Sequence, residues 1–204
     1  EADSSEYMAL LGLAEISMRK RALHAAIPHL QRAMRAQARR VEAPFQLAQV
    51  YRMLRRDDDA RALLEKIVEQ FPTYTPACMA YADLLMTDAP PSPQHALEQY
   101  EAVLTVDPTL LRAQAGAAAS RLRLGLFADA IRDFKMLLKS KPRDPHLTFL
   151  LGTALHWQQS YAEAVTAYKT AINSLPAVSP LIPVRLWNLR LAYLAQHGVY
   201  PVNL

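Results

Sequence analysis

Four prolines recur at nearly equal spacing, and this spacing constrains the fold more than any other feature of the sequence. Pro72, Pro108, Pro142 and Pro176 are separated by 36, 34 and 34 residues. A period of this length is typical of solenoids, in which each unit contacts only its neighbours, and not of a domain with a single core. With one period added at the N-terminal end, the spacing divides the chain into five blocks. These blocks are residues 7–40, 41–74, 75–110, 111–144 and 145–178.

Small and large residues recur at fixed positions within the blocks. The eighth position is always small, in Ala14, Ala48, Ala82, Ala118 and Gly152. A second small position precedes the end of each block, in Ala26, Ala60, Ala96, Ala130 and Ala164. Four residues later stands a large residue, in Leu30, Leu64, Tyr100, Phe134 and Tyr168. Small residues let two helices approach closely, the large residue fills the space between neighbouring repeats, and proline ends the second helix because it lacks an N–H. Each block is therefore predicted to contain two helices of about 12 to 15 residues.

This pattern resembles the tetratricopeptide repeat (TPR), a helix–turn–helix unit of about 34 residues. The strongest matches are Leu151-Gly152 with Ala164, Tyr168, Ala171 and Pro176, and the run Gly125-Leu126-Phe127-Ala128-Asp129-Ala130 with Phe134 and Pro142. The sequence departs from the family where an aromatic residue is expected early in the first helix, at Leu10, Pro44, Cys78, Gln114 and Thr148. The resemblance implies an all-α fold over residues 7–178, an α–α superhelix (TPR solenoid) of antiparallel helix pairs.

The sequence also predicts the structure of the segments that lie outside the regular repeats. Residues 1–6 are predicted to be an N-terminal tail, and residues 179–204 a connector followed by a helix from Val184 to His197. That helix is either a cap or the first half of a sixth repeat. The third block has a two-residue insertion in its internal turn, where Ser92 is expected to be the N-cap and Pro93 the first helical residue. A partner contact and a neutral insertion both remain open for this loop.

Composition excludes several enzyme classes. The five glycines lie too far apart for a dinucleotide-binding or phosphate-binding loop or for a nucleophile elbow. Cys78 is the only cysteine, so a disulfide and a paired-cysteine metal site are both excluded, and we expect this residue to be a buried small hydrophobe. The six histidines are never three or four residues apart, which excludes a helical metal pair. We therefore expect no enzyme activity, no metal and no cofactor.

Charge is distributed unevenly along the chain. The net charge of +4 arises from residues 1–56, because the remaining residues are close to balance. Arg32, Arg35 and Arg39 are predicted to share one helical face. This face is either a phosphate-binding stripe or a solvated surface, and the lack of interleaved aromatic residues favours the second interpretation. No nucleic-acid partner is expected.

In TPR proteins the first helices line a concave groove that holds ligands, so the resemblance implies where a partner would bind. Groove-facing side chains are expected at the second, fifth, ninth and twelfth positions of each block. The residues assigned to this partner groove are Met8, Leu11, Phe45, Gln49, Arg52, Met79, Asp83, Met86, Arg112, His146, Phe149, Thr153 and His156. The Lys and Asn clamp of one TPR class is absent, and Phe45, Met79 and Phe149 predict an apolar surface instead. Such a surface suits an amphipathic helix or an extended apolar segment.

Two hypotheses about function follow. The first is a non-catalytic scaffold that binds a protein or peptide partner in the groove, for example in a bacterial assembly or secretion system. The second is a TPR substrate-recognition arm cut from a larger enzyme, such as a glycosyltransferase or sulfotransferase. The chain begins at Glu1, which leaves a mature form and an excised fragment both open. Membrane association is expected only through partners or an absent N-terminal segment, and the cytoplasm and the periplasm fit the sequence equally well.

Overall fold

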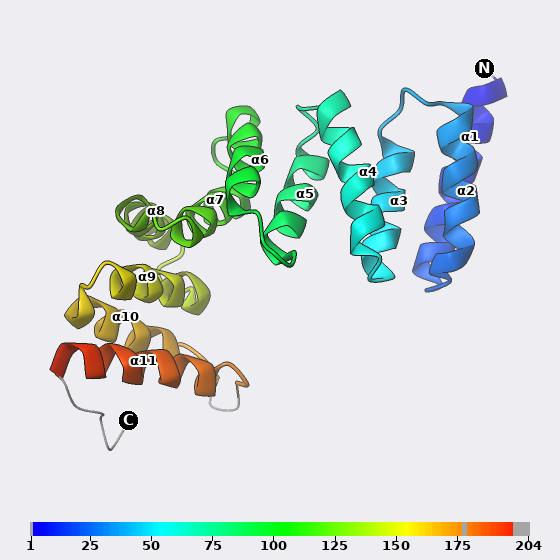
Figure 1. Cartoon of the computed structure of the whole chain (residues 1–204). Coiled ribbons are helices and arrows are strands. Elements are labelled where there is room, and N and C mark those ends of the chain that lie inside the picture. The colour runs from blue at the N-terminus through cyan, green and yellow to red at the C-terminus, as the bar shows by residue number, and fades with distance from the viewer. Residues whose placement is uncertain (1, 177–178, 198–204) are drawn as a thin grey trace. The chain divides into compact units, whose positions relative to one another are not determined.

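The computed structural model describes residues 2–176 and 179–197, and within these residues the chain forms eleven α-helices joined by short turns (Figure 1). The helices are α1 (Ala2–Arg19), α2 (Leu23–Ala36), α3 (Glu42–Met53), α4 (Asp57–Gln70), α5 (Thr75–Thr87), α6 (Pro93–Val106), α7 (Leu111–Arg123), α8 (Phe127–Ser140), α9 (Pro145–Trp157), α10 (Tyr161–Asn173) and α11 (Ile182–His197). Because α1 begins at Ala2, residues 2–6 are helical, and the predicted N-terminal tail is wrong there.

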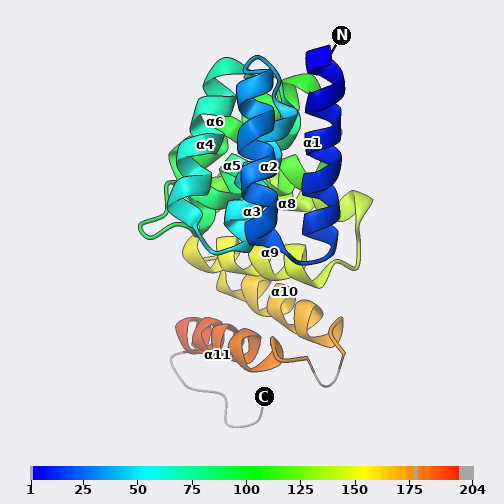
Figure 2. The same ribbon diagram turned by 90° about the vertical axis from the view of Figure 1, so that its right-hand side faces the viewer.

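The helices belong to two compact units. Unit 1 is Glu1–Pro91 and contains α1 to α5, and unit 2 is Ser92–Leu204 and contains α6 to α11. The boundary falls in the inserted turn of the third block. Within each unit, every helix packs against the next helix along the chain (Figures 1 and 2). Ser92 is the N-cap residue of α6 and Pro93 begins this helix, as predicted, although the Ser92 side chain makes no capping hydrogen bond.

Four of the five internal turns share one backbone conformation. Arg21, Arg55, Gly125 and Gln159 each occupy the fifteenth position of their block and have φ angles of 57°, 60°, 79° and 67°. Two backbone hydrogen bonds close the first helix at each turn, as in Arg55 N to Arg52 O and Arg56 N to Tyr51 O. This is the Schellman arrangement, in which a left-handed residue satisfies the last carbonyl groups of a helix. Gly125 adopts the conformation without steric cost, whereas the other three residues carry a side chain there.

Each first helix from α3 onward has two buried faces. The third, seventh and tenth positions face the preceding helix: Leu47 and Val50 of α3 belong to one buried cluster with Ala14, Ala26 and Leu30 of α1 and α2. The eighth position faces the second helix of the same block, because a side chain on Gly152 would meet Tyr168 and Ala167 of α10. The second, fifth, ninth and twelfth positions lie on the remaining side, which we call the open face.

The repeated small and large residues form the core, as the spacing predicts. The alanines at both small positions are fully buried in every block, and the large residues Leu30, Leu64, Tyr100, Phe134 and Tyr168 are at most 3% exposed. Their partners differ between blocks. Tyr168 lies against Gly152 of its own block, whereas Tyr100 lies against Gly116 of the following block. Glycine at these places leaves room for an aromatic ring that an added Cβ would displace.

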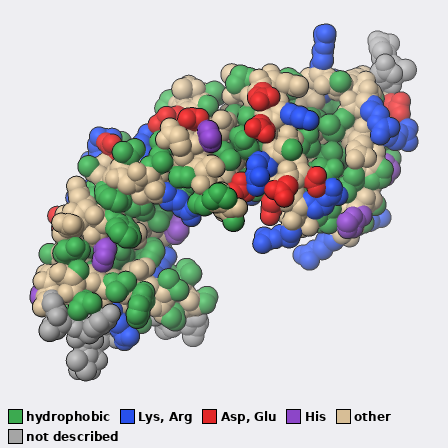
Figure 3. Space-filling view, in the orientation of Figure 1, with side chains coloured by type: hydrophobic (Ala, Val, Ile, Leu, Met, Phe, Trp, Pro, Cys, Tyr) green, Lys and Arg blue, Asp and Glu red, His purple; other side chains and the backbone are tan. Residues whose placement is uncertain are grey.

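The basic residues of the N-terminal region do not form one helical stripe. Arg32 and Arg35 lie in α2, but this helix ends at Ala36, so Arg39 lies beyond it and the predicted shared face is wrong. Arg32 pairs with Glu6 of α1, with its Nη2 atom 3.0 Å from Glu6 Oε1. Figure 3 shows Lys and Arg side chains of unit 1 interspersed with Asp and Glu side chains. This arrangement is typical of a solvated surface of mixed charge.

Candidate functional site

In unit 2, the open face includes residues that the repeat pattern does not assign, because α11 packs on α10 as a further helix. Arg185, Leu189 and Ala192 of α11 are buried and have the same spacing as Leu147, Leu151 and Ala154 of α9. When α11 is aligned with α9 in this way, the connector before α11 is four residues longer than in a regular repeat. The alignment also assigns four residues of α11 to the open positions. These residues are Val184, Trp187, Leu191 and Leu194.

The α11 open face is strongly apolar and exposed. Val184 and Trp187 have exposed fractions of 61% and 56%, whereas Leu191 and Leu194 are half-buried. In the matched register Trp187 occupies the fifth position, the same position as Phe149 in α9. Hydrophobic side chains reach the surface over the part of the molecule formed by α9 to α11 (Figure 3). Contiguous exposed apolar side chains mark sites of interaction more often than scattered ones do.

A buried arginine holds α11 beside Phe149. Arg185 is 4% exposed, donates a hydrogen bond from Nη1 to the Pro145 carbonyl oxygen at 2.8 Å, and places its guanidinium 4.9 Å from the centre of the Phe149 ring. Removal from water lowers the pKa of Arg185, while the nearby Asp144 carboxylate favours its charge. Phe149 also contacts Tyr168, with ring centres 5.4 Å apart. The Phe149 ring is thus half-buried, and part of its surface supports α11 instead of facing solvent.

In unit 1, the open face combines apolar side chains with a polar cleft. Met8 is exposed, Leu11 and Met86 are half-buried, and Phe45 packs edge-on against Tyr74 with ring centres 5.4 Å apart. Met79 is only 7% exposed, so it belongs mainly to the core and offers little surface to a partner. The sequence pattern does not distinguish these cases because all of these positions are apolar.

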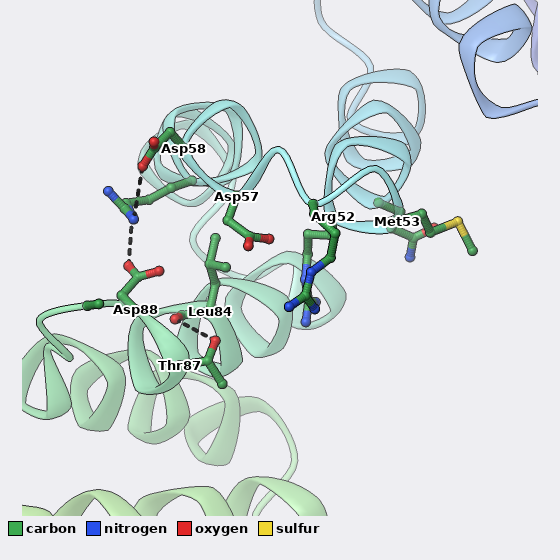
Figure 4. A pocket seen from close by; sticks show the side chains of 11 residues that line it. Arg52, Met53, Asp57, Asp58, Leu84, Thr87 and Asp88 are labelled. Carbon is green, nitrogen blue, oxygen red and sulfur yellow. Dashed lines mark hydrogen bonds and ion pairs between the residues drawn. The ribbon is translucent and has the colours of Figure 1, made fainter.

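The polar cleft lies where α3 and α5 end and α4 begins (Figure 4). It has a volume of about 860 Å³, which is within the range of ligand sites. Gln49 and Arg52, two of the predicted groove residues, lie on its wall. The other lining residues are Met53, Arg55, Asp57, Asp58, Arg61, Leu84, Thr87, Asp88 and Ala89.

Ion pairs organise one side of this cleft. Arg61 Nε lies 2.7 Å from Asp88 Oδ2, and Arg61 Nη2 lies 3.3 Å from Asp58 Oδ1. The hydrogen bond to Asp88 raises the pKa of Arg61 above its ordinary value. Figure 4 shows Arg52 on the other side of the cleft, near Asp57. The cleft therefore offers hydrogen-bond donors and acceptors of both charges, with Leu84 as an apolar floor.

One histidine at an open position of α9 lies among aromatic rings. His156 is half-buried between the rings of Trp157 and Tyr161, whose centres lie 6.1 and 5.5 Å away, and its Nδ1 atom is buried without a hydrogen-bond partner. Burial lowers the pKa of His156 and favours the neutral ring. Among the described residues, no group of three His, Cys, Asp or Glu side chains is arranged to hold a metal ion.

Comparison with known proteins identifies the repeat. Two models, both of tetratricopeptide repeats, match residues 17–84 and 116–178. The chain belongs to the tetratricopeptide repeat (TPR) family. Its fold is an all-α TPR solenoid of antiparallel helix pairs, as the sequence predicts. No curated protein sequence matches the chain.

Several solved TPR structures are similar to the chain. MamA is 17% identical with a TM-score of 0.74, and the match covers 98% of this chain and 100% of MamA. YrrB, a TPR protein with an unusual peptide-binding site, is 14% identical with a TM-score of 0.77, over 92% of this chain and 97% of YrrB. A TPR protein from Parabacteroides merdae ATCC 43184 is 18% identical with a TM-score of 0.70, over 93% of this chain and 73% of its own. At these low sequence identities, the structural similarity shows that the chain shares the fold of these proteins.

The predicted groove residues of this TPR protein fall into two sets, one in each unit. Unit 1 contains Met8, Leu11, Phe45, Gln49, Arg52, Met79, Asp83 and Met86, and unit 2 contains Arg112, His146, Phe149, Thr153 and His156. Gln49 and Arg52 meet at one cleft, and Phe149 is joined to α11 through Arg185. Within the described residues, no helix is both long enough and apolar enough to cross a membrane.

Proposed function

We propose that the chain is a non-catalytic scaffold that holds an apolar segment of a partner protein on the open face of unit 2, which is the concave side in a TPR array. The observation that carries this proposal is the exposure of Val184 and Trp187 in register with Phe149. Exposing tryptophan and valine side chains to water is unfavourable, whereas burying them in an interface is favourable because tryptophan contributes a large apolar area.

The partner segment is proposed to be an amphipathic helix or an extended apolar strand. Leu191 and Leu194 extend the apolar surface along α11 by two helical turns, which matches the length of a short amphipathic segment. Thr153 and His156 of α9 are half-buried polar residues at open positions beside this apolar surface. A short apolar segment that carries a few polar groups fits both the apolar surface of α11 and the polar residues of α9.

The unit 1 cleft is proposed as a second contact site for polar partner groups. Its lining includes side chains that can donate hydrogen bonds to a partner, Gln49 and Arg52, and carboxylates that can accept them, Asp57, Asp58 and Asp88. Because Arg61 already pairs with Asp58 and Asp88, Arg52 is the cation best placed for a carboxylate of the partner. Substituting Arg52 by Gln is expected to weaken binding less than loss of the apolar surface, because an exposed charge pair contributes about 1 kcal/mol or less.

Selection from a displayed random-peptide library, followed by calorimetric titration of the selected peptides, tests the proposal. We expect peptides rich in Leu, Met and Phe, and a loss of affinity of about 30-fold or more in Trp187→Ala, since a buried tryptophan anchor contributes about 2 kcal/mol or more. The matched control is Trp157→Ala: Trp157 is also well exposed, but it lies outside the open face and stacks on Phe127 at 6.4 Å.

One result would contradict the proposal, and a second would move the test to another residue of the same surface. If Trp157→Ala and Trp187→Ala weaken binding equally, the open face of unit 2 is not the site. If Trp187→Ala unfolds the protein, as judged by circular dichroism, Trp187 has a structural role, and Val184→Ser then provides the test of the same surface.

A further inference from the structure

One helix face of unit 1 is exposed although its counterparts elsewhere are buried. The third, seventh and tenth positions of the first block are Ala9, Leu13 and Ile16, and the exposed fractions of Leu13 and Ile16 are 46% and 50%. The corresponding residues of the later blocks are all at most 9% exposed: Ala43, Leu47, Val50, Ala77, Tyr81, Leu84, Ala113, Ala117, Ser120, Leu147, Leu151 and Ala154. In those blocks a preceding helix covers this face. In α1 the face is apolar in the same way but uncovered within the described residues.

We propose that this α1 face is a homodimer interface, on which α1 of a second copy of the chain packs in the antiparallel direction. Gly12 lies at the middle of the stripe, and the space beside it is open, with no atom within 4 Å of an added Cβ. With a two-fold axis near Gly12 and Leu13, Ala9 of one copy lies opposite Ile16 of the other. A small residue opposite a large one at both ends of the stripe lets the two helices interdigitate.

Charge complementarity identifies a second copy as the occupant and fixes its direction. Glu6, Leu13 and Lys20 are spaced by seven residues, so they lie on one side of the helix, with Leu13 at the centre. In an antiparallel pair each Glu6 faces Lys20 of the other copy, which gives two opposite-charge contacts. A parallel pair would place Glu6 against Glu6 and Lys20 against Lys20.

The side chains needed for these contacts are accessible. The Glu6 side chain is 52% exposed, and its ion pair with Arg32 of α2 is itself exposed to solvent. Lys20 is exposed directly after the end of α1, and its N–H still bonds to the Ile16 carbonyl oxygen at 3.0 Å, which continues the helical path. An 18-residue helix is about 27 Å long, so the contact is small and the dimer is expected to be weak and dependent on concentration.

Sedimentation equilibrium over micromolar to millimolar concentrations of the full chain tests the interface. We expect the parent chain to change from monomer to dimer over this range, and Leu13→Asp with Ile16→Asp to remain monomeric throughout. The matched control is Val106→Asp with Met136→Asp, which replaces two equally exposed apolar residues of unit 2 and should leave the dimer unchanged. Glu6→Lys and Lys20→Glu should each weaken the dimer several-fold, and their combination should restore it.

Crosslinking tests the direction of the pair. Cys78 is buried, so a single introduced cysteine is the only accessible thiol. A short bis-maleimide should join two copies through Gly12→Cys, which lies near the axis, but not through Ser5→Cys, which lies far from its own counterpart in an antiparallel pair. Equal crosslinking at both positions would show a parallel pair and overturn the proposed geometry. A parent chain that stays monomeric, or a dimer unaffected by the Leu13 and Ile16 substitutions, would overturn the interface itself.

Discussion

Substitution of Gly152 by alanine should destabilise the protein even though alanine is the better helix former. In α9 the added Cβ would lie 2.8 and 2.9 Å from two ring atoms of Tyr168 and 3.3 Å from the Ala167 Cβ. Tyr168 cannot move away easily, because it is buried, contacts the Phe149 ring and places its hydroxyl 3.4 Å from Thr153 Oγ1. Overpacking of this kind costs about 1–3 kcal/mol, which exceeds the gain of about 1 kcal/mol from replacing glycine in a helix.

Gly12→Ala is the matched control for this prediction. Gly12 also lies in a helix, but its added Cβ would meet no atom within 4 Å, so only the helix-propensity gain of about 1 kcal/mol remains. Urea unfolding followed by circular dichroism, at a protein concentration low enough to keep the chain monomeric, should show opposite effects on the free energy of unfolding. Combining Gly152→Ala with Tyr168→Leu should recover part of the loss, because the smaller side chain relieves the contact. Equal stability of the two alanine variants, or strict additivity in the double variant, would refute the reasoning.

Two further predictions concern the left-handed residues of two turns and one titrating group. Gln159→Gly should stabilise unit 2 by up to about 1 kcal/mol, and Gly125→Ala should destabilise it by a similar amount, because both residues hold a left-handed φ; thermal melting of the two variants checks the opposite signs. Burial lowers the pKa of His156 in the folded protein below its unfolded-state value of about 6.5. The stability that comes from keeping this ring neutral is therefore complete above about pH 6.5, and it is lost as the pH falls through the folded-state pKa. Tryptophan fluorescence, which reports unit 2 through Trp157 and Trp187, should therefore show a larger loss of stability between pH 7 and 5 in the parent than in His156→Gln.

Local spacing was enough to predict the repeat and its core. Pro72, Pro108, Pro142 and Pro176 end the second helices because proline restricts its own backbone and that of the preceding residue, a property that needs no tertiary context. The eighth-position small residues are buried because the helical period brings them to the same face in every block. The helical repeat could be derived from these rules, whereas the open positions of the first helices were implied by the resemblance to TPR proteins. The start of α1 could not be derived in this way, because residues 2–6 precede the first block and hold none of the repeated positions.

The tertiary structure alone decided which open-face residues are available to a partner. Met79 and Phe45 occupy equivalent positions in sequence, yet Met79 is buried and Phe45 is half-buried, because their surroundings come from other helices. Arg185 joins α11 to the start of α9, because its hydrogen bond to the Pro145 carbonyl oxygen links residues 40 positions apart. Trp187 therefore enters the candidate site through a long-range contact, and such contacts leave no trace in the spacing of neighbouring residues.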